Sequence, residues 1–225
     1  LFRSSAASDV YKRQVINTIN TRLDAETIAY ILDHSDAKLL ITDTQFSPTM
    51  KKALKIYGKN IPIIDIHDDQ AVFKDGEGEQ IGEMTYEEFL QTGDDNYNWS
   101  LPEDEWQAIS LSYTSGTTGK PKGVVYHHRG SYLMSTGSVT AWNMPNKLTF
   151  LYTVPMFHCN GWGYPWTAAL IHAKIICCRY IVAKDIYNLI DKYKVTHFGG
   201  APIVLSLIAN ADEKDKKEIN HKVYV

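Results

Sequence analysis

The sequence predicts an α/β fold in which parallel sheets are flanked by helices. The expectation comes from short apolar runs that alternate with helical patterns along most of the chain. Strands that alternate with helices pair in parallel, because each helix returns the chain across a face of the sheet. With 225 residues, of which 44% are hydrophobic and 22% charged, the chain can form one large core or two smaller ones.

The first part of the chain has two strand–helix repeats. Apolar residues recur at helical spacing after Thr21 or Asp24, either of which could cap a helix, and Gly58 is a helix stop. In order, we expect a helix over 21–35, a strand over 38–42, a helix over 48–57, a strand over 61–66, an exposed acidic loop over 67–82, a short helix over 85–90 and a polar linker over 94–104.

The second part repeats the alternation, and Pro202 suits the first turn of its last helix. The alternating apolar residues of 220–225 predict a final strand. In order, we expect strands over 108–113, 147–154, 174–178 and 195–198, and helices over 131–142, 164–171, 185–193 and from Pro202 onward.

Composition excludes several classes of function. The net charge of −3 gives no basic field for nucleic acid or for an anionic membrane. The longest apolar stretch, 167–182, is interrupted by histidine, lysine and arginine, so no membrane span is expected. Cys159, Cys177 and Cys178 form no CxxC pair, which predicts buried free thiols in a reducing, cytoplasmic setting rather than a zinc site or a disulfide framework.

Residues 113–124 form the most informative segment of the sequence. They contain three glycines, four Ser or Thr hydroxyls and two lysines, directly after an apolar run. Glycines expose backbone N–H groups, hydroxyls add donors and lysine adds a charge, a set that suits nucleotide phosphates. Gly116 and Gly119 enclose only two residues, and Pro121 follows Lys120, so this is not a Walker A loop. A magnesium-binding hydroxyl would come from within the loop; the alternative is a surface turn without a ligand.

This segment resembles the phosphate-binding signature of the adenylate-forming, or AMP-binding, superfamily. That superfamily includes acyl-CoA synthetases, luciferase-like enzymes and the adenylation domains of peptide synthetases. Three further segments resemble one acyl-CoA synthetase branch, that of the medium-chain fatty-acid and methylthiopropionate CoA ligases and the plant acyl-activating enzymes. They are Asn-Thr-Ile-Asn-Thr-Arg-Leu at 17–23, Pro-Met-Phe-His-Cys-Asn-Gly-Trp at 155–162 and Phe-Gly-Gly-Ala-Pro at 198–202.

The resemblance implies roles for the phosphate-binding residues. Thr114 would be the hydroxyl near Mg²⁺, and Lys122 a catalytic lysine on the phosphates of ATP. Lys120 would also bind phosphate, although a solvated surface lysine is an equal alternative. The residues that would wrap the β- and γ-phosphates are Ser115, Gly116, Thr117, Thr118 and Gly119.

The resemblance also implies an acyl pocket. His158 follows a predicted strand, where α/β sheets bind ligands, and would contact the carboxylate or adenylate as a hydrogen-bonding or cationic group. A structural histidine is the alternative. Trp162 would gate the acyl tunnel or pack in the core, and Trp142 and Trp166 are expected in the core or pocket wall. The strand-to-helix turn would lie near the pocket or be structural only; it consists of Gly199, Gly200, Ala201 and Pro202.

The predicted function is therefore that of a fragment of an ATP-dependent, AMP-forming acyl-CoA synthetase, an acid–thiol ligase. The parent enzyme would use ATP, Mg²⁺ and coenzyme A with a short- to medium-chain fatty acid, in the cytoplasm or an organelle such as the peroxisome, and could form a homo-oligomer. The alternatives are another adenylating enzyme, of the peptide-synthetase or luciferase-like type, and a non-catalytic nucleotide-binding fragment.

The two ends of the sequence carry their own expectation. Residues 1–14 look like a non-native tail, because Leu-Phe-Arg-Ser is what the end of a common sequencing adapter encodes. Residues 15–225 would be a partial AMP-binding domain without its adenine site and C-terminal lysine. The isolated fragment is expected to be inactive.

Overall fold

The computed structural model describes residues 15–69, 71, 73, 76–98, 100–114 and 119–225. The predicted tail over 1–14 lies outside these residues. The chain divides into two compact units, one that ends at His127 and one that spans His128–Val225, and each is described by itself.

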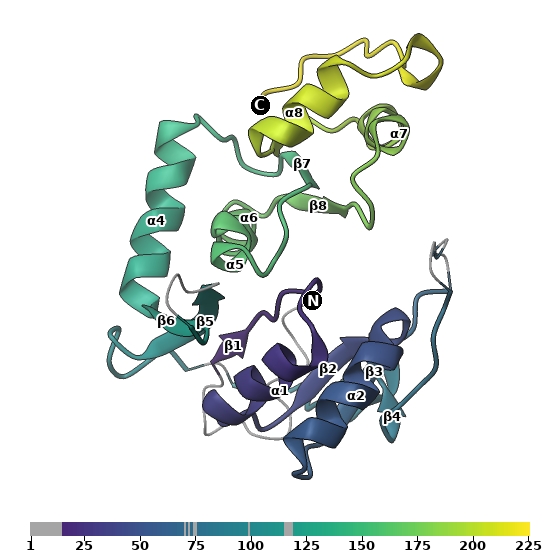
Figure 1. Ribbon diagram of the computed structural model, residues 1–225. Helices are drawn as coiled ribbons and strands as arrows, with labels where there is room; N and C mark the ends of the chain where they lie inside the picture. Colours follow the sequence, from purple (N-terminus) through teal and green to yellow (C-terminus); the bar gives the residue numbers. More distant parts are fainter. Residues whose placement is uncertain (1–14, 70, 72, 74–75, 99, 115–118) are drawn as a thin grey trace. The chain divides into compact units, whose positions relative to one another are not determined.

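The first unit contains a parallel sheet covered by two helices, as the alternation predicted. Its strands are β2 (Leu40–Asp43), β3 (Ile63–Ile66) and β4 (Met84–Thr85), in that order. Helices α1 (Ala25–His34) and α2 (Ser47–Tyr57) lie side by side on it (Figure 1). The short helices η1 (Thr44–Phe46) and α3 (Tyr86–Gln91) complete this layer. Its core combines residues of both helices and of β2: Ile28, Leu32, Leu40, Met50 and Ala53.

Local chemistry sets the helix ends in this unit. Asp24, one of the two expected caps, begins α1 by accepting a hydrogen bond from the Thr27 N–H at 2.7 Å. Gly58 ends α2 with a φ of 66°, as expected for a glycine stop. A capping box between Thr85 and Glu88 begins α3.

A buried carboxylate anchors the acidic loop that follows β3. Asp65 has no exposed surface, and its oxygens accept hydrogen bonds from the N–H groups of Ile81 and Gly82 at 3.2 and 2.6 Å. The Ser47 hydroxyl accepts a further bond from the Glu79 N–H at 3.0 Å. The described part of the loop is therefore exposed, as predicted, but fixed at its C-terminal end.

The second sheet of this unit is mixed, with one antiparallel pair in addition to the parallel pairing that was expected. Strand β1 (Ile16–Asn17) pairs in parallel with β5 (Ala108–Thr114), and β5 pairs antiparallel with β6 (Lys122–His127). Strand β6 was not predicted, because its residues were assigned to the phosphate loop and its exit.

The second unit contains a three-stranded parallel sheet. Its order is β8 (Lys174–Cys177), β7 (Thr149–Tyr152) and β9 (His197–Gly199). Helices flank it, as expected: α4 (His128–Ala141), α6 (Tyr164–Leu170), α7 (Ala183–Tyr193) and α8 (Pro202–Ala209), followed by η2 (Glu213–Asp215).

Strand β7 is buried on both faces and separates two cores. Phe150 and Tyr152 belong to one cluster, together with Tyr164 of α6. Leu151 belongs to the other, together with Ile186 of α7 and others. This alternation follows from the two-residue period of a strand and places β7 at the centre of the unit.

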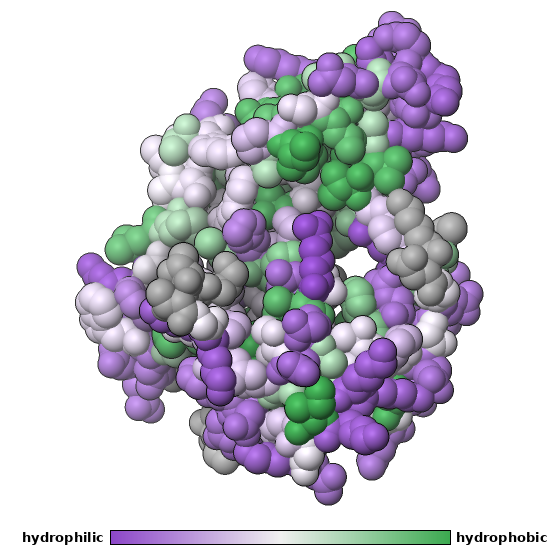
Figure 2. Space-filling view, in the orientation of Figure 1, coloured by the Kyte–Doolittle hydropathy of each residue, from purple (hydrophilic) through white to green (hydrophobic). Residues whose placement is uncertain are grey.

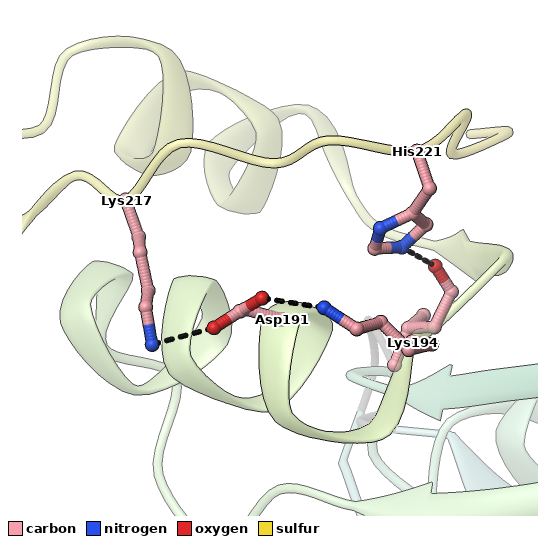
Figure 3. Close-up of polar contacts among 5 residues, drawn as sticks. Asp191, Lys194, Lys217 and His221 are labelled. Carbon is pink, nitrogen blue, oxygen red and sulfur yellow. Dashed lines mark hydrogen bonds and ion pairs between the residues drawn. The ribbon is translucent and has the colours of Figure 1, made fainter.

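The end of the chain is fixed to α7 by polar contacts (Figure 3). The Asp191 carboxylate lies 2.8 Å from the Lys194 ammonium and 2.6 Å from that of Lys217. The His221 ring and the Val195 carbonyl are joined by a hydrogen bond of 2.8 Å. The salt bridges hold the pKa of the Asp191 carboxyl down, at about 2.

The expected strand over 220–225 is reduced to a single bridge. Tyr224 forms a parallel bridge with His197 of β9. Its N–H donates a hydrogen bond to the Thr196 carbonyl at 2.8 Å, and its carbonyl accepts one from the Phe198 N–H at 3.1 Å. The Tyr224 ring stacks on His197 with centroids 4.8 Å apart. The alternation thus placed the segment at the sheet but overstated its pairing.

Two of the three cysteines and Trp142 are more exposed than a core position allows. The three cysteines are free, as predicted, but Cys159 and Cys177 are exposed and only Cys178 is half-buried. Burial raises the pKa of the Cys178 thiol to about 11. Trp142, expected in the core or pocket wall, is 45% exposed, because it lies at the C-terminal end of α4.

Apolar side chains also reach the surface along α8, where Figure 2 shows hydrophobic residues gathered. Val204 of that helix is buried, whereas Ile203 is 75% exposed. Among the residues described, none of the helices combines the length and the apolar character that crossing a membrane requires.

Candidate functional site

The predicted phosphate loop joins the two strands of the β5–β6 hairpin. Thr114, the last residue of β5, pairs directly across the ladder with Lys122, the first residue of β6. Directly opposite residues of an antiparallel pair project to the same face of the sheet. The hairpin therefore brings together the expected metal-binding hydroxyl and the expected phosphate-binding lysine, both of them exposed.

The remaining loop residues are described in part. Gly119 has a φ of 137° and open space around the position of a Cβ, so its backbone is accessible. The four residues expected to wrap the phosphates, Ser115, Gly116, Thr117 and Thr118, lie outside the described residues.

Helix α1 contacts the loop end of this hairpin through two side chains, Tyr30 and His34, that were not singled out in the sequence. The Tyr30 hydroxyl donates a hydrogen bond to the Pro121 carbonyl at 3.4 Å, and the Lys120 ammonium lies 5.0 Å from the centroid of the Tyr30 ring. His34 Nδ1 lies 2.8 Å from the hydroxyl of Tyr113. Lys120 is exposed, as the surface interpretation expected, but it also makes this cation–π contact.

The predicted acyl-pocket residues of the second unit gather at one edge of its sheet. Strands β7 and β9 are parallel neighbours, with Tyr152 paired to Gly199, so their carboxyl ends meet. The Thr153 hydroxyl donates a hydrogen bond to the Gly199 carbonyl just beyond that pair. The segment that carries His158 and the turn that begins at Gly199 therefore leave the sheet side by side, where ligands bind in α/β folds.

The segment after β7 makes a left-handed turn. Five successive residues have positive φ: Cys159 (47°), Asn160 (44°), Gly161 (62°), Trp162 (55°) and Gly163 (71°). The first four form α5 (Cys159–Trp162). Three of the five are not glycine, and at about 1–2 kcal/mol per residue their left-handed conformation costs roughly 3–6 kcal/mol. Such strain persists only where surrounding contacts determine the conformation, and it gathers at functional sites.

Contacts from three other elements, β7, α4 and α6, hold this turn. The Tyr152 hydroxyl donates a hydrogen bond of 2.8 Å to the Gly161 carbonyl, and a Cβ on Gly161 would lie 1.8 Å from that hydroxyl. A Cβ on Gly163 would lie 1.7 Å from the methyl group of Met134 on α4. The Thr167 hydroxyl donates to the Gly163 carbonyl at 3.2 Å. Only glycine fits at both positions.

Burial disfavours ionisation of the hydroxyls of Tyr152 and Tyr164. Burial raises the pKa of Tyr152 well above its usual range and that of Tyr164 to about 12. Tyr164 lies close both to Trp162 and to the turn that begins at Gly199. Its ring centroid is 6.5 Å from that of Trp162, and its hydroxyl would be 2.8 Å from a Cβ on Gly199. Gly199 is thus also fixed as a glycine by close packing.

The turn presents two side chains at the surface. His158 is exposed and precedes α5 as its N-cap, where its carbonyl accepts a hydrogen bond from the Trp162 N–H at 3.1 Å. Trp162 is 37% exposed, so it is not a fully packed core residue. Gly200 and Ala201 are half-buried, and Pro202 is exposed at the start of α8.

The described residues contain no cluster of three or more His, Cys, Asp or Glu side chains that could hold a metal ion. The exposed Thr114 hydroxyl and the oxygen atoms of a bound phosphate would offer oxygen ligands to a cation at the hairpin. This donor set is the kind that Mg²⁺ uses with nucleotides.

Comparison with known proteins gives consistent matches. The model of the AMP-binding enzyme family matches residues 13–224. A peroxisomal acetate/butyrate–CoA ligase of Arabidopsis thaliana is 41% identical over 220 residues, which cover 94% of this chain and 39% of the relative. An acetate–CoA ligase of Humulus lupulus is 44% identical over 209 residues, covering 89% of this chain and 37% of that protein.

A solved structure shares the fold. The o-succinylbenzoate coenzyme A synthetase of Bacillus subtilis, in complex with ATP and magnesium ion, superposes with a TM-score of 0.67 at 20% identity and covers 88% of this chain and 36% of that one. The chain spans about two fifths of the length of the curated relatives it matches. The match of the family model to nearly the whole sequence shows that the chain belongs to the AMP-binding enzyme family.

Proposed function

We propose that this chain forms the phosphate-binding and acid-binding part of an AMP-forming acyl-CoA synthetase. In the first step the oxygen of a carboxylate would attack the α-phosphorus of ATP, forming acyl-AMP and expelling pyrophosphate. In the second step the thiol of coenzyme A would attack the acyl carbon and release AMP. The hairpin that pairs Thr114 with Lys122 at its mouth carries this proposal.

The hairpin would bind the pyrophosphate end of ATP. Charge accumulates on phosphate oxygens as the bond to the leaving group breaks, so positioned donors and cations stabilise the transition state. Lys122 would supply the cation, and Thr114 would ligate Mg²⁺, which screens the phosphate charge when it is bound. The backbone N–H groups and hydroxyls of the loop would complete the cradle, from Ser115, Gly116, Thr117, Thr118 and Gly119, with Lys120 beside them.

The edge of β7 and β9 would bind the acid. His158 would donate a hydrogen bond to the carboxylate or to the adenylate; no general base is required, since a carboxylate is ionised at neutral pH. Trp162 would close the acyl pocket. The small residues of the neighbouring turn would let the acyl chain approach the backbone: Gly199, Gly200, Ala201 and Pro202.

We propose a short acyl chain as substrate. The proposal is supported by the relatives named above, whose names give acetate and butyrate as their acids. A cytoplasmic enzyme is our first proposal and a peroxisomal one the alternative, which the peroxisomal relative supports. A homo-oligomer of the native-length enzyme is part of the same proposal.

The test begins with the gene. The reading frame would be followed in both directions, and the native-length protein would be incubated with ATP, Mg²⁺, coenzyme A and an acid of two, four or eight carbons. We expect AMP and the acyl-CoA of the short acids as products, seen by mass spectrometry. A carrier-protein domain in the frame, light emission with a luciferin, or nucleotide binding without thioester formation would overturn the proposal in favour of the alternatives.

A further inference from the structure

The left-handed turn depends on one hydroxyl group from outside it. Tyr152 lies on β7, nine residues before Gly161, and its hydroxyl donates to the Gly161 carbonyl at 2.8 Å in a buried setting. Gly161 is the middle residue of the five with positive φ. The bond therefore acts at the centre of the strained segment, at a residue that lies between His158 and Trp162 in the sequence.

The geometry leaves the turn little freedom while this contact is present. The Tyr152 hydroxyl fills the space in which a Cβ of residue 161 would lie, at 1.8 Å, and Met156 Sδ closes the same space at 3.3 Å. Tyr152 is itself 5% exposed and packs in the core with Phe150 and Tyr164. The core of the sheet is thus connected directly to the turn that carries the exposed side chain of Trp162.

We infer that Tyr152 is a positioning residue of the acid-activation site: its hydroxyl holds the left-handed turn that presents His158 and Trp162 to the carboxylate. The inference rests on the proposed function and deepens it. Tyr152 touches neither substrate nor reacting atoms in this account. Its effect is to fix the direction of two side chains that do, and geometric precision of this kind determines how productively a bound acid lies.

The variant Tyr152→Phe removes the hydroxyl and keeps the ring in the core. It also leaves the Gly161 carbonyl without its donor in a buried position. Tyr187→Phe is the matched control, because the Tyr187 hydroxyl likewise donates to a backbone carbonyl, that of Ile208, at 3.4 Å between α7 and α8.

The first measurement needs no activity. Backbone dihedral angles of residues 159–163 would be determined by NMR in the labelled 225-residue chain and in both variants. We expect Tyr152→Phe to shift residues 159–162 out of their positive φ, and Tyr187→Phe to leave them unchanged. A turn that keeps its left-handed conformation without the hydroxyl would overturn the inference.

The second measurement separates positioning from general damage. In the native-length enzyme, Tyr152→Phe should raise the KM for butyrate about fivefold to tenfold, the loss expected for one hydrogen bond, while the KM for ATP stays within about twofold of wild type. An equal change in both constants, or none, would overturn the inference. If the wild-type enzyme uses no carboxylic acid, the proposed function fails, and the NMR result still decides whether Tyr152 holds the turn.

Discussion

Replacement of Gly161 by alanine tests whether close packing at the left-handed turn is as tight as the structure indicates. The new Cβ would lie 1.8 Å from the Tyr152 hydroxyl and 2.9 Å from Cζ of the same ring. Overpacking costs about 1–3 kcal/mol, and alanine at a φ of +62° costs about 1–2 kcal/mol more, so we expect roughly 2–5 kcal/mol of destabilisation. Urea unfolding of the 225-residue chain would measure it.

The control for this variant is Gly137→Ala. Gly137 lies inside α4, and a Cβ there would have no atom within 4 Å. Alanine in a helix interior should stabilise the chain by about 0.5–1 kcal/mol. Adding Tyr152→Phe to Gly161→Ala should recover part of the loss, because the nearest atom recedes from 1.8 to 2.9 Å. A Gly161→Ala variant as stable as Gly137→Ala would refute the reasoning.

Three further predictions concern other parts of the chain. Asp65→Ala should destabilise by about 2–4 kcal/mol in urea unfolding, because two partly buried N–H groups lose their buried acceptor, whereas Asp36→Asn at the surface should change stability by under about 0.5 kcal/mol. Burial lowers the pKa of His197. The stability that neutral His197 contributes is therefore present above the unfolded pKa of about 6.5 and is lost as the pH falls below that value. Urea midpoints measured from pH 7.5 to 5 should decline less steeply in His197→Gln than in the wild type, and equal slopes would contradict this. In the native-length enzyme Lys122→Met should lower kcat/KM for ATP by about 10- to 100-fold, while the equally solvent-facing Lys38→Met should not.

Local signals in the sequence were sufficient for most elements of the fold. Asp24 begins α1 by side-chain capping, Gly58 ends α2 in a left-handed conformation, and Pro202 begins α8. All three signals depend on adjacent residues only. The parallel pairing of β2 with β3 and of β7 with its neighbours follows from the strand–helix alternation. The helix ends could be predicted because each is determined within a few residues, and the strand pairing because the alternation of strands and helices restricts it.

Features that depend on distant contacts were not predictable in the same way. The left-handed turn contains Cys159 and Trp162, which have no intrinsic preference for positive φ, and it forms because Tyr152 and Met134 fix two glycines. Strand β6 was missed because the loop between β5 and β6 was interpreted only as a phosphate-binding segment, and nothing in it indicated that the chain returns to pair antiparallel with β5.

The candidate site shows the same division. The family resemblance implied roles for Thr114 and Lys122, and these roles stay predictions; the hairpin register shows that the two residues lie directly opposite each other. Tyr30 and His34, which contact the hairpin from α1, could have been noticed only as an aromatic pair one helical turn apart. Nothing local indicated that they face residues about 80 to 90 positions later in the chain.

Acid-dependent exchange of labelled pyrophosphate into ATP is the most direct test of the central claim, because it reports acyl-AMP formation without coenzyme A. The native-length protein should catalyse this exchange with acetate or butyrate and Mg²⁺, and should lose it when the acid is left out. Exchange that does not depend on any carboxylic acid, or no exchange with any of them, would contradict the account.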